Sequence, residues 1–233
     1  DYFNVYTAWA MSYESGIGSL NTLRDTKFKT EYGNFTHNSR IHCEADYTMQ
    51  YAVEHSPVTA QTLNKALVIL VPNCGVYDGV TYMYSDGSAL AICPKSEMEY
   101  PNDARGLVQH EACGHGFGKL TDEYVYHRAW IQTCLCVCCA HASELLQEQN
   151  MGWGKNVSLK GRYNDVPWKH LIYDSRYNDI VDIYDGGFYH SNGVYRSEHN
   201  SVMNNNVPYF STWSRQLVVE RIKRLAGEKF DYE

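Results

Sequence analysis

The sequence predicts a mixed α/β domain, and three stretches carry that prediction. Residues 66–71 are continuously apolar and rich in β-branched residues, as in a strand covered on both faces. Residues 79–93 contain two short strand-like runs around a Ser-Asp-Gly-Ser turn. Two segments with helical spacing follow, one near residue 110 and one at the C-terminal end. This order favours a mixed sheet with helices packed on it.

The remaining elements are predicted from local composition. Residues 2–11 resemble a strand, and residues 14–40 are polar enough to be loop. A helix is predicted over residues 104–118, with Asn102 or Asp103 as its cap and with Gly116 and Gly118 at its end. Residues 122–200 are rich in Tyr, Asn, Asp and Gly, and are predicted to be irregular apart from a short helix at residues 142–149.

The C-terminal segment is predicted to be an amphipathic helix that ends at Gly227. Its apolar residues recur at helical spacing: Phe210, Trp213, Leu217, Val218, Ile222 and Leu225. The 233 residues are enough for one domain over 1–233, with the sheet and the histidine-bearing helix in 1–121 and an irregular part in 122–233.

Composition excludes two classes of partner. The net charge of −7 leaves no basic patch for nucleic acid, and no apolar run reaches the ~18–20 residues of a membrane span. The 20 tyrosines suit either a half-buried β surface or a substrate groove. The oligomeric state stays open.

The eight cysteines are an even number, which permits disulfides and an exported protein. We therefore expect a secreted, periplasmic or cell-surface protein. Reduced, buried thiols are the alternative. The run "CLCVCCAH" contains Cys134, Cys136, Cys138 and Cys139, for which disulfides, thiols and a second metal site remain open.

The stretch "HEACGHGFGKLTDEY" carries the chemistry of the chain. A hydrolytic zinc site needs neutral imidazole ligands, an open position for water and a carboxylate base. His110 and His115 are five residues apart, and on a regular α-helix such residues diverge by about 140°. A π turn brings residues five apart back into line, so we expect a helix distortion near Gly114. The alternative is that one histidine is structural and no metal binds.

A third ligand is expected from the loop that follows. Gly118 allows a sharp turn, after which Asp122 and Glu123 offer carboxylate oxygens. Adjacent residues of an extended loop point to opposite sides, so only one of the two carboxylates can face the metal.

These residues together resemble the active site of the IgA-peptidase family of metallopeptidases, a branch similar to the metzincins. The matching residues are His110, Glu111, Gly114, His115, Phe117, Gly118, Leu120, Asp122, Glu123 and Tyr124. The additional residue between the histidines is similar to the His-Glu-x-x-Gly-His motif of dipeptidyl peptidase III, which binds zinc.

The resemblance implies zinc-dependent hydrolysis of a peptide or protein substrate on a metzincin-like mixed twisted sheet. Zinc would be held by His110, His115 and Asp122, and Glu111 would be the general base for a metal-activated water. Tyr124 would support the site or the oxyanion. Ser201-Val202-Met203 resembles the metzincin Met-turn, which places Met203 under the metal; a buried loop methionine is the alternative.

The resemblance also implies that an extended peptide pairs with the edge strand before the helix, in residues 79–93. An ordinary hairpin is the other interpretation. Metzincin-like domains usually begin with a further strand and a long helix, which are expected to be missing here. The rival function is a catalytically inactive, metal-stabilised binding or adhesion module, although such a module would not need Glu111.

Overall fold

The computed structural model describes residues 2–33, 40–126 and 135–232, with side chains left out for residues 135–141. The chain forms two compact units, Asp1–Phe117 and Gly118–Glu233. This boundary lies four residues before the predicted one between 121 and 122. The single catalytic domain stays a prediction, and the α/β class agrees with the mixed sheets and helices of both units.

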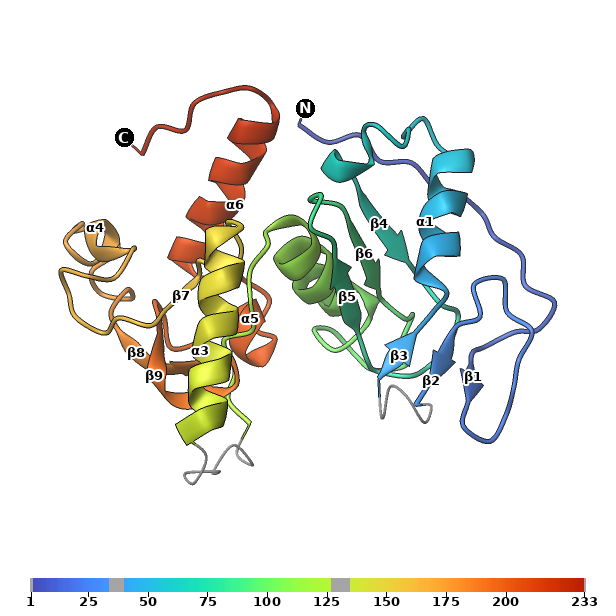
Figure 1. Ribbon diagram of the computed structural model, residues 1–233, viewed down its shortest axis with the longest axis horizontal. Helices are drawn as coiled ribbons and strands as arrows, with labels where there is room; N and C mark the ends of the chain where they lie inside the picture. The colour runs from blue at the N-terminus through green and yellow to red at the C-terminus, as the bar shows by residue number, and fades with distance from the viewer. Residues whose placement is uncertain (1, 34–39, 127–134, 233) are drawn as a thin grey trace. The chain divides into compact units, whose positions relative to one another are not determined.

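The first unit is organised around a three-stranded mixed sheet (Figure 1). Its strands are β4 (Leu67–Leu70), β5 (Val80–Met83) and β6 (Ala89–Ile92), in the order β4-β6-β5. β6 pairs parallel with β4 and antiparallel with β5, so the predicted strand and hairpin are confirmed. Every residue of β6 is buried, but β4 is half-buried, with Ile69 40% exposed. The prediction that β4 is covered on both faces was therefore wrong.

The other elements of this unit are short. They are β1 (Gly18–Ser19), β2 (Glu31–Tyr32), β3 (Ile41–His42), α1 (Ala45–Glu54) and the 3₁₀ turn η1 (Leu63–Lys65). Helix α1, which lies against β4, was not predicted. Its N-cap residue is Glu44, whose side chain makes no capping hydrogen bond. The sequence therefore lacks the Ser, Thr, Asp or Asn that usually marks the start of a helix.

The strand predicted for residues 2–11 is wrong. This segment belongs to no sheet of the described residues, and Val5 and Trp9 are each 88% exposed. Its composition is strand-like, but a strand forms only where a neighbouring strand accepts and donates its backbone hydrogen bonds.

A short α-helix and a π-helix complete the first unit. They are α2 (Ala104–Leu107) and η2 (Val108–Phe117), which follow each other directly. Leu107 and Ala112 pack in a buried cluster with Ala91 and Cys93 at β6. The helical segment that contains both histidines therefore packs against the buried strand β6.

The second unit contains a small antiparallel sheet and several helices (Figure 1). Its strands, in the order β7-β9-β8, are β7 (Val157–Ser158), β8 (Tyr184–Gly187) and β9 (His190–Arg196). Its helices are α3 (Leu135–Asn150), α4 (Lys169–Ile172), α5 (Val202–Asn205) and α6 (Thr212–Leu225).

Two predictions for this unit need correction and one is confirmed. The short helix predicted at 142–149 is the second half of the longer α3, and the region predicted as irregular contains the β8–β9 hairpin. The hairpin was missed because its turn, Phe188-Tyr189, has none of the Gly or Asn residues that usually mark one. The C-terminal helix is α6, which is capped by the Ser211 hydroxyl and followed by Gly227 at φ +75°.

The core of the second unit is aromatic. The indole of Trp213 on α6 is buried with Trp168 and three aliphatic residues, Val166, Leu171 and Val181. Within the described part of the chain, every helix is too short or too polar to cross a membrane.

Candidate metal centre

The histidine-bearing segment begins at a capped helix. The carboxylate of Asp103 accepts hydrogen bonds from the backbone N–H groups of Arg105 (2.9 Å) and Gly106 (3.4 Å), which fixes the start of α2. The helix then widens into the π-helix η2, in which residues five apart lie above one another. The ring centroids of His110 and His115 are 4.9 Å apart at an interplanar angle of 72°. The predicted distortion is confirmed.

Close packing on the sheet holds η2 in place. At Gly116, a Cβ atom would lie 2.5 Å from the Cδ1 atom of Leu67 on β4. Because real Cβ atoms do not approach so closely, a larger residue here would require the Leu67 side chain or η2 to shift. Gly116 thus serves helix–sheet packing, and it also lies at the predicted helix end, because η2 ends at Phe117.

Glu111, the predicted general base, is buried and held by β5. The hydroxyl of Thr81 lies 2.8 Å from Oε2 of Glu111 and 2.9 Å from its backbone oxygen. A hydroxyl has one proton, so Thr81 donates to one of these oxygens at a time. Next to it, Gly79 leaves the space that the Glu111 side chain fills, since a Cβ atom there would lie 2.7 Å from Cγ of Glu111.

The chain turns after η2 at the predicted Gly118, but the left-handed residue of the turn is the next one. Lys119 has a φ of 55°, in the left-handed region, whereas Gly118 is not among the residues with positive φ. Lys119 is buried with its ammonium group 5.6 Å from the ring centre of Trp153, and Leu120 packs with Val202 and Met203. The packing of these buried side chains fixes the turn. The prediction from sequence had attributed the turn to the conformational freedom of Gly118.

Asp122 and Glu123 point to different partners, as expected for neighbours in an extended segment. Oδ2 of Asp122 accepts a hydrogen bond of 2.6 Å from the hydroxyl of Tyr189. Glu123 is fully buried, and its carboxylate accepts hydrogen bonds from Asn156 Nδ2 (2.9 Å) and Ser201 Oγ (2.5 Å). Burial raises the pKa of Glu123, although these two hydrogen bonds act in the opposite direction.

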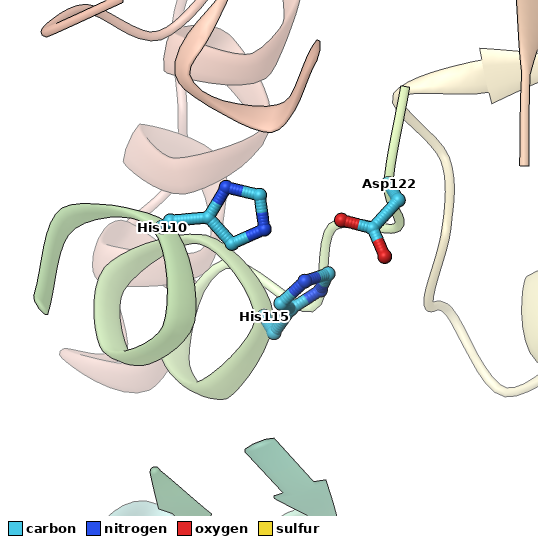
Figure 2. Close-up of side chains that lie close together, drawn as sticks. All are labelled: His110, His115 and Asp122. Carbon is cyan, nitrogen blue, oxygen red and sulfur yellow. The ribbon is translucent and has the colours of Figure 1, made fainter. Parts of the chain in front are cut away.

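The three predicted ligands come together. His110, His115 and Asp122 each offer one donor atom, and these atoms all lie within 4.8 Å of one another. Figure 2 shows the two imidazole rings on η2 and the Asp122 carboxylate on the chain after it. His110 and Asp122 are buried and His115 is half-buried, so the donors are largely shielded from solvent. This group could hold one metal ion.

The other two predicted site residues lie in the second unit. The ring of Tyr124 is 5.4 Å from those of Tyr126 and Tyr189, and burial, followed by the Asp122 charge, raises the pKa of Tyr124. Met203 is fully buried in α5, a short helix whose C-cap residue, Asn206, has a φ of 55°. The Met-turn, with Met203 under a metal, stays a prediction.

Glu123 connects this turn to the ligand-bearing segment. Its backbone N–H donates to the carbonyl of Met203 at 2.7 Å, and its carboxylate accepts from Ser201 in the same turn. The residue beside the third ligand is thus fixed to the Ser201–Met203 turn by two hydrogen bonds.

Sequence reasoning missed four residues that hold the carboxylates of the centre: Thr81, Asn156, Tyr189 and Ser201. None lies within the motif. Ser201 belongs to the stretch that resembles a Met-turn, but nothing in the local sequence connects it to Glu123. The other three are single polar residues whose partners are distant in the chain.

The cysteine predictions are tested only in part. Cys43, Cys74, Cys93 and Cys113 are free thiols, so these four do not form the expected disulfides. Burial raises the pKa of Cys43 to about 11. Cys134 and the side chains of Cys136, Cys138 and Cys139 lie outside the described residues, and their state stays a prediction.

No protein-family model matches the chain, and no curated protein sequence matches it significantly. The function assigned to the centre therefore depends on its own residues and geometry.

Proposed function

We propose that this chain is a zinc-dependent peptide hydrolase of the IgA-peptidase family, with zinc held by His110, His115 and Asp122. The observation that carries the proposal is the convergence of these three donors. The π-helix that supplies the two histidines also carries Glu111, a buried carboxylate that accepts a hydrogen bond from Thr81. A structural zinc site is closed by four protein ligands, whereas three ligands leave a position open for catalysis.

The donor set suits a hydrolytic metal. Two imidazoles and one carboxylate are zinc ligands, while calcium and magnesium prefer all-oxygen sites. A zinc ion bound there would act as a Lewis acid that polarises a peptide carbonyl and makes water more acidic. The same donor types also bind non-haem Fe(II), and the feature that favours hydrolysis is Glu111, a base directly after the first ligand.

Glu111 would move the proton of the reaction. Its carboxylate takes a proton from the attacking water and later gives that proton to the leaving amine, so the residue ends in its starting state. The Thr81 hydroxyl engages one carboxylate oxygen, Oε2, and so fixes how the other is presented. Gly79 lets the side chain lie close against β5, which limits its other rotamers.

The substrate would be an extended peptide that adds to β5. This strand is at the edge of the sheet, and it also carries Thr81, which contacts Glu111. Strand addition satisfies the peptide backbone whatever its sequence, so it suits a hydrolase of peptides or proteins.

A chelator experiment tests the proposal. The purified chain is expected to contain one zinc ion and to cleave a mixed library of fluorogenic peptides. Treatment with 1,10-phenanthroline should abolish cleavage, and added zinc should restore it. A chain that holds zinc but cleaves no peptide would instead support the inactive binding module, and stoichiometric iron would contradict the choice of metal.

A further inference from the structure

The hairpin turn that carries Tyr189 is unusual. β8 ends at Gly187 and β9 begins at His190, so Phe188 and Tyr189 are the two central residues of the turn. Their φ angles are 47° and 67°, both in the left-handed region. Two-residue hairpins with positive φ at both positions strongly prefer Asn-Gly, because large side chains are strained there.

Packing explains only the first of these two aromatic residues. Phe188 is buried with Leu145, Val157 and Val194, where it contributes to the core. Tyr189 is half-buried, and its hydroxyl donates a hydrogen bond of 2.6 Å to Oδ2 of Asp122. A strained conformation that core packing does not explain is typical of a functional position.

The turn is attached to the ligand-bearing segment at several points. The N–H of Phe188 donates to the carbonyl of Asp122 (2.8 Å), and the N–H of Tyr189 donates to the carbonyl of Tyr124 (3.1 Å). The Tyr189 ring also stacks on that of Tyr126, with centroids 5.3 Å apart and an interplanar angle of 13°. The hydroxyl of Tyr189 is thereby fixed in position and direction relative to Asp122.

We infer that Tyr189 is a positioning residue that fixes the orientation of the Asp122 carboxylate as a metal ligand, an inference that rests on the proposed metal centre. A free carboxylate can coordinate a metal through one or both oxygens. The hydrogen bond from the Tyr189 hydroxyl to Oδ2 restricts rotation of this carboxylate, and so determines how it is presented to a metal. Three protein ligands leave a position open for water and substrate.

The test compares two tyrosine variants of the same aromatic cluster. Tyr189→Phe removes the hydroxyl and keeps the ring, while Tyr126→Phe makes the same change in the ring stacked on it. Zinc affinity is measured by competition with a chromogenic chelator, and the coordination of Co²⁺ by its visible absorption. Far-UV circular dichroism and thermal unfolding of the metal-free proteins check that both variants fold.

Tyr189→Phe is expected to bind zinc about 10–100-fold more weakly, as for other residues that orient a metal ligand. Its Co²⁺ absorption should change, because a carboxylate that is free to rotate alters the coordination of the metal. Tyr126→Phe should match the wild type in both measurements. Equal affinity and an unchanged Co²⁺ spectrum in Tyr189→Phe would overturn the inference, as would an equal loss in Tyr126→Phe. A wild-type chain that binds no metal would overturn the metal centre itself.

Discussion

The two segments that supply the ligands are positioned in different ways. In η2, the histidines are brought together by the helix itself, because five residues make one π turn. In the segment that follows, Asp122 is held by Tyr189, which is 67 residues away in the sequence, and Glu123 by Ser201, which is 78 residues away. Local geometry orients the first pair of ligands, and tertiary contacts orient the third.

This difference predicts different responses to mutation. Substitutions near η2 should slow the reaction by displacing Glu111 slightly, while the helix itself remains intact. Changes around Asp122 and Glu123 should separate metal binding from stability, because these neighbouring carboxylates have different partners.

The largest expected effect comes from Glu111→Gln. The amide keeps the shape of the side chain but cannot accept the proton, so turnover should fall by about 10²–10⁴-fold. Zinc content should stay at the wild-type level, because Glu111 is not among the ligands. Turnover is compared with zinc content in the same preparation, and near-normal cleavage by the zinc-loaded variant would exclude Glu111 as the base.

The second prediction contrasts two alanine substitutions. Asp122→Ala should weaken zinc binding by more than the ~10–100-fold typical of supporting residues, because it removes a ligand. Glu123→Ala should keep most of the zinc but lower the free energy of unfolding by about 1–3 kcal/mol, since it leaves Asn156 and Ser201 without their buried partner. Zinc affinity and urea unfolding measure the two effects. The reverse pattern would assign the ligand to Glu123.

The third prediction uses two glycines of the first unit. In Gly79→Ala, the new Cβ would lie 2.7 Å from Cγ of the buried Glu111, so the base must shift and turnover should fall by roughly 10-fold or more. Gly75→Ala is the matched control, because its Cβ would meet Glu97, an exposed side chain that can move away. Equal activity of the two variants would show that the position of Glu111 does not depend on Gly79.

The smallest effect is expected at Thr81. Thr81→Val keeps the shape but removes the hydroxyl, and the loss of one hydrogen bond to Glu111 should lower kcat by about 2–10-fold. Thr81→Ser retains the hydroxyl and should stay close to the wild type. If both variants lose the same activity, the effect comes from packing of the methyl group rather than from orientation of the base.

The same division between local and distant contacts explains how much the sequence could predict. The spacing of His110 and His115 predicted a π turn, and the apolar runs predicted β4, β5 and β6, because these features depend on neighbours in the chain. Asp122 was preferred to Glu123 as the ligand for two reasons: adjacent side chains point to opposite sides, and the family resemblance implies the ligand at this aspartate. The two carboxylates do point to different partners.

Features set by tertiary contacts could not be predicted. The left-handed φ in the turn after η2 is at Lys119 rather than at Gly118, because the buried lysine and Leu120 are fixed by packing. The positive φ values of Phe188 and Tyr189 contradict local propensity, so the β8–β9 hairpin and its hydrogen bond to Asp122 were missed. Residues 2–11 show the opposite error. Their composition is typical of a strand, but among the described residues no neighbouring strand pairs with them.

The central claim is that His110, His115 and Asp122 bind one zinc ion, and anomalous diffraction at the zinc edge tests it most directly. Crystals grown with zinc should show one strong peak about 2.0–2.1 Å from a nitrogen atom of each histidine. One Asp122 oxygen should lie about 2.0–2.2 Å from the peak. Glu123 should remain on Asn156 and Ser201. A peak at another site, or a zinc ion bound by Glu123 while Asp122 points away, would contradict the account.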